Sequence, residues 1–211
     1  NQEAFVMQTK GVLVVVSGFS GAGKGTVMKA LLNKYDNYAL SVSATTRNPR
    51  PGEENGREYF FLTESQFEDM IKNDELIEHA RYVDHYYGTP KKYVEEKMAA
   101  GKDVILEIEI QGALNIKKKF PDALLVFIVP PTAEDLKKRL TGRGTESAEV
   151  IEKRLRRAAE ESDGMDSYDY IVVNDDIDTC VEDLHSLIRS SHFKESANTD
   201  LVARMKQELH D

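Results

Sequence analysis

The sequence is poor in the residues that build disulfide scaffolds and nucleic-acid interfaces. Of its 211 residues one is cysteine and none is tryptophan, which excludes an internal disulfide and a metal cluster built on several thiolates. The 28 lysines and arginines are outnumbered by 37 aspartates and glutamates, giving a net charge of −9. A chain without a basic field is poorly suited to a nucleic-acid backbone, so we expect no nucleic-acid partner.

Long hydrophobic runs are also missing. No apolar stretch approaches the length of a membrane span, and no secretory signal pattern is visible. We therefore expect no membrane association and a cytoplasmic location, and nothing indicates an obligatory protein partner. The single cysteine, Cys180, falls in an amphipathic pattern, where we expect a packed or half-exposed thiol rather than a nucleophile.

The most informative segment is rich in glycine. It follows the apolar run 12–16 and precedes a helix-like stretch at 27–34. A strand, a glycine loop and a helix in this order predict a phosphate-binding loop, because glycines let backbone N–H groups turn onto a phosphate at the helix N-terminus. Lys24 would reach the terminal phosphates as a point charge. The residues expected to bind a nucleoside triphosphate here are Gly18, Phe19, Ser20, Gly21, Ala22, Gly23, Lys24, Gly25 and Thr26.

One position departs from the usual loop. Gly25 directly follows the lysine, where Ser or Thr normally meets Mg²⁺, and Thr26 comes one residue later. The alternative is a turn that merely joins a strand to a helix, but the flanking elements match as well as the spacing. The GKGT form of the loop resembles that of nucleoside monophosphate kinases.

Five apolar runs predict buried parallel strands, because runs that are apolar at consecutive positions suit a sheet covered on both faces. Helical patterns alternate with these runs, which predicts a three-layer α/β fold with a five-stranded parallel core sheet. Helix starts are expected at a capping box on Thr63, at Pro90 as the first helical residue, and at Thr132. The five runs are residues 12–16, 38–42, 104–110, 124–129 and 170–173.

Two segments interrupt the alternation. Residues 44–90 are polar, aromatic and rich in arginine, and residues 132–162 are highly charged. We predict that both are insertions over the carboxyl ends of the strands, where α/β sheets bind ligands. The expected domain therefore spans 11–189, with peripheral termini at 1–10 and 190–211. Its core comprises 11–43, 91–131 and 163–189.

Arginines and aromatic residues gather in the first of these segments. Arg47 and Arg50 lie three residues apart around a proline, and two guanidinium groups can hold a phosphate in bidentate fashion. Tyr59 could add a hydroxyl donor. The alternative is a solvated loop whose arginines pair with neighbouring glutamates such as Glu53.

Taken together, several motifs closely resemble those of guanylate kinases, in order from about residue 11 to residue 189. This resemblance implies a P-loop kinase fold in which 44–90 binds GMP and 132–162 forms a lid. It also implies reversible, Mg²⁺-dependent transfer of a phosphoryl group from ATP to GMP, and to dGMP, giving ADP and GDP. Besides the loop, the motifs are 43–47 with Pro49 and Arg50, 56–59, 86–89, 111–112, 142–146 and 173–176.

The resemblance also implies roles for individual residues. The acceptor phosphate would be held by Arg47, Arg50, Tyr59 and Tyr87, and Glu53 would help to hold the loop and the nucleotide. The guanine would be read by Ser43, Glu78, Thr89 and Glu109. A carboxylate can accept from guanine N1–H and the exocyclic amine, whereas adenine has no N1–H donor. In isolation, Glu78 would be interpreted as an exposed helix-end charge and Tyr87 as a core aromatic.

The segment before Gln111 departs from the family. Family members commonly carry two aspartates there, and this chain has Glu107 and Glu109. Strand alternation predicts that both point to one face. One would approach the Mg²⁺ shell, often through water, and the other the guanine, and the assignment stays open. A salt-bridged structural pair is the alternative. Thr26 or Glu107 are the candidate Mg²⁺ ligands.

The second insertion would close over the triphosphate through Arg139, Arg143 and Arg154, with Arg157 one helical turn further on. Asn174 matches a residue near the adenine of ATP. The catalytic residues implied are Lys24, Arg50, Arg143 and Arg154. The acceptor is already an anion, so no general base is needed, and catalysis would consist of positioning and charge stabilisation. The alternative functions are a kinase for another small phosphorylated acceptor and a non-catalytic binding module.

Overall fold

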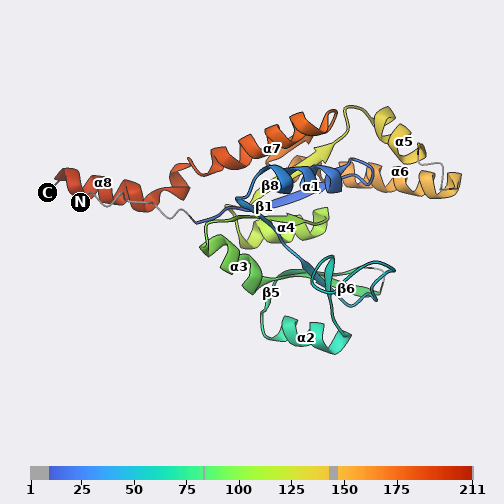
Figure 1. Cartoon of the computed structure of the whole chain (residues 1–211), viewed down its shortest axis with the longest axis horizontal. Helices are drawn as coiled ribbons and strands as arrows, with labels where there is room; N and C mark the ends of the chain where they lie inside the picture. Colours follow the sequence, from blue (N-terminus) through green and yellow to red (C-terminus); the bar gives the residue numbers. More distant parts are fainter. Residues whose placement is uncertain (1–9, 83, 143–146, 211) are drawn as a thin grey trace.

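The computed structural model describes residues 10–82, 84–142 and 147–210. Its central element is a five-stranded parallel sheet with the order β2-β7-β1-β8-β9, which confirms the predicted core sheet (Figure 1). The phosphate-binding loop follows β1, the middle strand. The five strands are β1 (Leu13–Gly18), β2 (Tyr38–Leu40), β7 (Asp103–Glu107), β8 (Leu124–Val129) and β9 (Tyr170–Val173).

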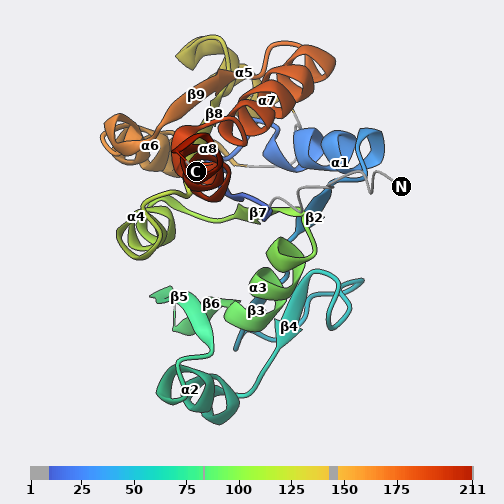
Figure 2. The same ribbon diagram turned by 90° about the vertical axis from the view of Figure 1, so that its left-hand side faces the viewer.

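Helices cover both faces of this sheet. Helices α1 (Lys24–Lys34) and α7 (Ile177–Ser191) pack on one face, and α3 (Lys91–Ala99) and α4 (Ile110–Lys119) pack on the other (Figure 2). Strand β1 shows why its residues are apolar without alternation. Val14 and Val16 join the hydrophobic cluster of α1 and α7, whereas Leu13 and Val15 join that of α3 and α4.

The insert (residues 44–90) contains most of a second sheet, with the order β4-β3-β6-β5. Helix α2 (Glu64–Lys72) packs against it and begins with the predicted capping box on Thr63. A small core of Ala44, Phe67 and Leu76 holds this unit together. Figure 2 shows it hanging below the core sheet. Its strands are β3 (Ser43–Thr45), β4 (Tyr59–Phe61), β5 (Leu76–Tyr82) and β6 (His85–Pro90).

The lid segment (residues 132–162) contains α5 (Ala133–Thr141) and α6 (Ala148–Ser162). Thr132 caps α5 by accepting from the backbone N–H of Asp135, and Ser147 caps α6 in the same way. The motif 142–146 connects the two helices, and its residues 143–146 lie outside the described residues. The expected domain boundaries stay predictions.

Several predicted element boundaries were wrong. The strands predicted over 12–16 and 38–42 are Leu13–Gly18 and Tyr38–Leu40. Pro90 is the last residue of β6 and the N-cap of α3, so the helix begins one residue later, at Lys91. The strand predicted over 104–110 is Asp103–Glu107, since Ile108 and Glu109 lie between the strand and α4, which begins at Ile110. Just beyond the strand, the backbone N–H of Ile108 still donates to the carbonyl of Val16, at 3.3 Å.

The C-terminal region contains two helices of different character. Helix α7 buries Val181, Leu184, Ile188 and Cys180, whereas Ile177 at its start is 38% exposed. Burial raises the pKa of the Cys180 thiol to about 11, in agreement with a packed, non-nucleophilic cysteine.

Helix α8 (Thr199–His210) has no buried residue and lies at one end of the molecule (Figure 1). Short 3-10 turns occupy Met165–Ser167 and Glu195–Ala197. Within the described ranges, no helix combines the length and apolarity that a membrane crossing requires.

Candidate active site

The glycine-rich segment forms a tight loop between β1 and α1. Gly21 and Gly23 have φ angles of 88° and 85°, a left-handed conformation that side chains disfavour. Gly23 also has a neighbour at close range, since a Cβ atom there would lie 2.6 Å from the Nδ2 of Asn174. The loop therefore adopts the strand–loop–helix geometry that the sequence predicted, with the positive end of α1 directly behind it.

Lys24 folds back over this loop. Its Nζ donates to the carbonyl of Gly18 at 2.8 Å. Burial lowers the pKa of Lys24 below its usual value, while the carboxylates of Glu107, Glu161 and Glu109 act in the opposite direction. The lysine is thus a partly desolvated cation facing several carboxylates, and an anion bound nearby would stabilise its charge.

A cavity of about 630 Å³ opens beside the loop. It brings together most residues predicted to bind ATP. The side-chain Nδ2 of Asn174 donates to the backbone carbonyl of Ala22, and the backbone carbonyl of Asn174 accepts from the Arg139 guanidinium. The Oδ1 of Asn174 is buried and has no hydrogen-bond partner among the described residues. The cavity is lined by Phe19, Ser20, Gly21, Gly23, Lys24, Gly25, Thr26, Glu107, Arg139, Asn174, Asp175 and Ile177.

The predicted acceptor-phosphate residues gather in the insert. Arg47 forms a bidentate ion pair with Glu53, with N–O distances of 2.9 and 3.0 Å, and its guanidinium lies 5.3 Å from the ring centre of Tyr59. The rings of Tyr59 and Tyr87 are 6.1 Å apart. The Arg50 side chain is exposed, and its backbone N–H donates to Glu53 at 2.7 Å. Glu53 therefore organises the loop that carries both arginines.

Glu78 is a buried carboxylate in β5, and not the exposed helix-end charge that it would suggest in isolation. Only 6% of the residue is exposed, and its Oε1 accepts from the Thr89 hydroxyl at 3.1 Å. Burial raises the pKa of Glu78 above its usual value. Its Oε2 lies beside Gly112 of α4, where a Cβ atom would come within 3.0 Å. Ser43 lies in the same sheet, at the start of β3.

The comparison with known proteins decides the family. A family model described as guanylate kinase matches residues 10–191. The chain belongs to the guanylate kinase family. The guanylate kinase of Caldanaerobacter subterraneus subsp. tengcongensis is 47% identical over 202 residues, which cover 96% of this chain and 98% of that protein. The guanylate kinase of Lactococcus lactis subsp. lactis is 50% identical over 188 residues, which cover 89% of this chain and 92% of that protein.

A solved structure gives the same result for the fold. The crystal structure of guanylate kinase from Anaplasma phagocytophilum is similar to this chain with a TM-score of 0.70 and 33% identity, covering 88% of each chain. Membership in the guanylate kinase family confirms the resemblance inferred from the motifs, and the α/β P-loop fold with it. The roles of individual residues stay predictions.

Glu107 and Glu109, where guanylate kinases commonly carry two aspartates, lie in different elements. The prediction that both point to one face of a strand was therefore wrong. Glu107 ends β7 and lines the cavity beside Lys24. Glu109 is the N-cap of α4 and pairs with Arg157, with an N–O distance of 2.5 Å. The prediction failed because the strand ends at Glu107, so that strand alternation does not extend to Glu109.

The arginines expected to form the guanylate kinase lid occupy different positions. Arg139 of α5 lines the cavity, and Arg154 lies in α6, one turn before Arg157. Arg143 lies outside the described residues, so its predicted role is neither supported nor contradicted here. The sequence interpretation missed Asp175 and Ile177, which line the cavity, and Tyr82, which contacts Arg157. The one sequence signal for Asp175 and Ile177 is their position next to Asn174, at the start of α7.

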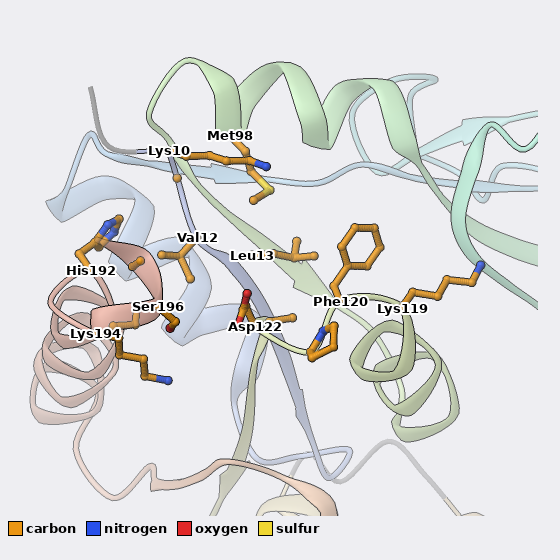
Figure 3. Close-up of a pocket in the computed structure, with 15 residues that line it drawn as sticks. Lys10, Val12, Leu13, Met98, Lys119, Phe120, Asp122, His192, Lys194 and Ser196 are labelled. Carbon is orange, nitrogen blue, oxygen red and sulfur yellow. The ribbon is translucent and has the colours of Figure 1, made fainter. Parts of the chain in front are cut away.

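A second cavity, of about 410 Å³, lies at the opposite, amino-terminal edge of the core sheet (Figure 3). Its basic side chains do not converge on one point. Lys119 extends away from it and donates to the carbonyl of Ile77, and His192 is hydrogen-bonded to the buried carboxylate of Asp103. These contacts tie the ends of α4 and α7 to neighbouring strands, and the catalytic motifs of the guanylate kinase family lie at the other edge.

Proposed function

We propose that this chain transfers the terminal phosphoryl group of ATP to GMP through the residues gathered at the carboxyl ends of the core strands. The observation that carries the proposal is the pairing of two features in one guanylate kinase fold. One is the phosphate-binding loop with Lys24 beside its cavity. The other is the buried Glu78–Thr89 pair in the insert. Neither alternative function is favoured by the comparisons or by the described part of the chain.

The donor end would be held by the loop. Backbone N–H groups and the N-terminus of α1 would bind the β-phosphate, and Lys24 would stabilise the negative charge on the transferring phosphoryl group. Arg139, Arg143 and Arg154 would add positive charge from the lid segment. Asn174 would offer to the adenine side of the nucleotide its buried Oδ1, which has no hydrogen-bond partner in the described part of the chain.

The acceptor end would be held by the insert. Arg47 is already fixed by Glu53 and by the face of Tyr59, so that it can present its remaining donors to the phosphate of GMP. Arg50, Tyr59 and Tyr87 would complete the phosphate contacts. Because the acceptor phosphate is an anion, the protein's task is to bring two negative groups together in line and to shield them from water.

The guanine would be read by the buried polar pair. Ionised Glu78 can accept from both N1–H and the exocyclic amine, and the Thr89 hydroxyl holds the carboxylate in place. AMP would leave that carboxylate unpaired in a buried site, which is a strong basis for discrimination. Ser43 would supply a further polar contact. Glu109 is paired with Arg157, so its predicted contact with guanine requires that pair to open.

Guanylate kinases generally require a divalent metal, and we propose Mg²⁺ as that ion here. Thr26 and Glu107 both line the cavity beside Lys24, and their hydroxyl and carboxylate oxygens fit the hard-ligand preference of Mg²⁺. Both would hold the ion mostly through water. The bound ion would neutralise charge on the phosphates. A cytoplasmic location, the use of dGMP and independence of a protein partner stay predictions.

The test is a coupled assay with Mg²⁺, ATP and a panel of GMP, AMP, CMP and UMP. We expect turnover with GMP and a drop of about 10²–10³-fold in kcat for Lys24→Ala, because a preorganised charge at the transferring group is removed. Lys29→Ala, an exposed lysine of the same helix, is the matched control and should keep its activity. Absence of GDP formation by the wild type, or near-normal kcat in Lys24→Ala, would refute the proposal.

A further inference from the structure

One arginine of the lid segment contacts three separate parts of the molecule. The Arg157 guanidinium donates from Nε to Glu161 at 3.0 Å, from Nη2 to Glu109 at 2.5 Å and from Nη1 to the Tyr82 hydroxyl at 2.7 Å. It also lies 5.3 Å from the ring centre of Tyr82. Each nitrogen of the guanidinium therefore has a partner, a pattern that suits the planar fork of arginine.

These partners belong to elements that would move separately. Glu161 lies on α6 with Arg157 itself, Glu109 caps α4 in the core, and Tyr82 ends β5 in the insert. Figure 2 shows α6, α4 and β5 one above another on the same side of the molecule. Arg157 thus joins the lid segment, the core and the insert through side-chain contacts.

The contact continues toward the predicted acceptor-phosphate site. Tyr82 lies 6.5 Å from Tyr87 in an edge-to-face arrangement, and Tyr87 lies 6.1 Å from Tyr59. The Tyr59 ring in turn supports Arg47. Three tyrosines thus form a series of ring contacts from the lid segment to the arginine expected to hold GMP. A shift of Tyr82 would therefore change the position of Arg47.

The same cluster is close to the donor side. Glu109 and Glu161 act to raise the pKa of Lys24, and Arg157 acts to lower it. Arg157 therefore offsets part of the negative charge that these glutamates place near Lys24. The position of α6 therefore affects the charge around the phosphate loop, through Arg157 and Glu161.

We propose that Arg157 is a positioning residue that couples binding of the donor nucleotide under the lid segment to binding of the acceptor in the insert. This inference rests on the proposed function. When α6 lies against Glu109, the same guanidinium holds Tyr82 and draws the insert toward the lid segment. Binding of one nucleotide then favours the arrangement that the other nucleotide requires, and the coupling is reciprocal.

The proposal also accounts for the longer carboxylate at position 109. Glu109 is engaged by Arg157 from outside the strand, so it serves the contact with the lid segment. Guanine recognition is then left to Glu78, and Glu107 alone of the two is placed beside Lys24. A glutamate reaches one methylene further than the aspartate common in the family.

The experiment measures binding of GMP with and without a non-hydrolysable ATP analogue and Mg²⁺, by calorimetry on the full chain. In the wild type we expect the analogue to tighten GMP binding at least about 5-fold. In Arg157→Ala and in Tyr82→Phe we expect this factor to fall below about 2-fold, while GMP affinity without the analogue changes little. Arg157→Lys should not restore the factor, because an ammonium cannot serve three acceptors in one plane.

Arg156→Ala is the matched control, since Arg156 is a neighbouring exposed arginine that pairs with Glu152 of the same helix. It should keep the wild-type factor. Tyr82→Phe keeps the ring and removes one hydroxyl at a residue that is 48% exposed, so it remains informative if Arg157→Ala folds poorly. A wild-type factor near 1, or an unchanged factor in Tyr82→Phe and Arg157→Ala, would overturn the inference. If the wild type forms GDP in either case, the proposed function survives.

Discussion

At the scale of single residues, Glu78 illustrates how this site combines stability with function. The carboxylate is buried, receives one hydroxyl hydrogen bond from Thr89 and packs against Gly112. A charged group in such a place destabilises the folded protein unless a ligand satisfies it. Guanine offers two N–H donors that would do so. The free enzyme thus holds an incompletely satisfied charge that its substrate can complete.

We therefore expect Glu78→Gln to stabilise the free protein and weaken GMP binding. Removal of the buried charge should raise the melting temperature by about 2–4 °C, the shift that about 1 kcal/mol produces in a chain of this size. GMP affinity should fall about 10-fold or more, because an amide NH₂ would face guanine donors. Differential scanning fluorimetry and calorimetry measure the two effects. Glu75→Gln, at an exposed position just before β5, should change neither.

The raised pKa of Glu78 also predicts a direction for pH dependence. Since the pKa in the folded protein is above the usual 4.5, protonation favours the folded state. The contribution of this group to stability is present below 4.5 and is lost as pH rises through the raised folded pKa. The difference in melting temperature between the wild type and Glu78→Gln should accordingly grow with pH over that window. A constant difference across the window would contradict the assignment.

At the scale of secondary-structure elements, the insert has a smaller hydrophobic cluster than the core sheet. Its buried apolar cluster consists of Ala44, Phe67 and Leu76, whereas the two clusters of the core sheet are much larger. Phe67 is fully buried, stacks on Tyr86 with ring centres 5.0 Å apart and lies against Gly88. Phe67 is therefore the largest fully buried side chain of the insert.

Phe67→Ala should open the insert while leaving the core folded. Truncation of a buried phenylalanine destabilises by about 3–5 kcal/mol, and the apolar side chains packed around this cluster, Phe60, Leu62, Met70, Ile71 and Tyr86, are only partly buried. Hydrogen exchange should accelerate in β5 and β6 and stay slow in β1 and β8. Leu184→Ala, in α7 of the core, is the contrasting variant and should destabilise the protein globally. Uniform acceleration in Phe67→Ala would show that the insert is not a separate unit.

The core strands and helix α2 of the insert were predictable from the sequence, and the strands of the insert were not. Strands β1 and β8 are buried on both faces, so their apolar runs are unbroken and unambiguous. Strands β3 and β4 have three residues each and are partly exposed, so they carry little hydrophobic signal. The phosphate-loop residues and the Arg47–Arg50 pair were inferred from the sequence pattern, and the other site residues from resemblance. The Arg157–Tyr82 contact joins residues 75 positions apart, which no local pattern indicates.

At the scale of the whole molecule, a chain with a net charge of −9 must bind two anions. The structure meets this requirement locally. Lys24 and Arg139 line the cavity at the carboxyl edge of the core sheet, and Arg47 is held in the insert. The general field of the protein repels nucleotides, so affinity must come from short-range contacts and from the loop backbone rather than from long-range attraction.

Ligand binding should therefore stabilise the whole chain selectively. At a GMP concentration of 100 times its Kd, the folded state should gain about 2.7 kcal/mol, equivalent to a rise of about 5–10 °C in melting temperature. AMP at the same concentration should give little or no shift, because it lacks the donors for Glu78. A thermal-shift series with both nucleotides checks this. Equal shifts from GMP and AMP would mean that the base is not read at the buried carboxylate.

The buried Cys180 has a practical consequence for the study of domain closure. Because the sequence has no other thiol and this one is fully enclosed, the natural chain should be almost inert toward maleimide dyes. Fluorophores attached to cysteines introduced at exposed positions such as Glu68 of α2 and Glu149 of α6 would then report the separation of insert and lid without background labelling. Cys180 would therefore not have to be replaced before labelling for single-molecule spectroscopy.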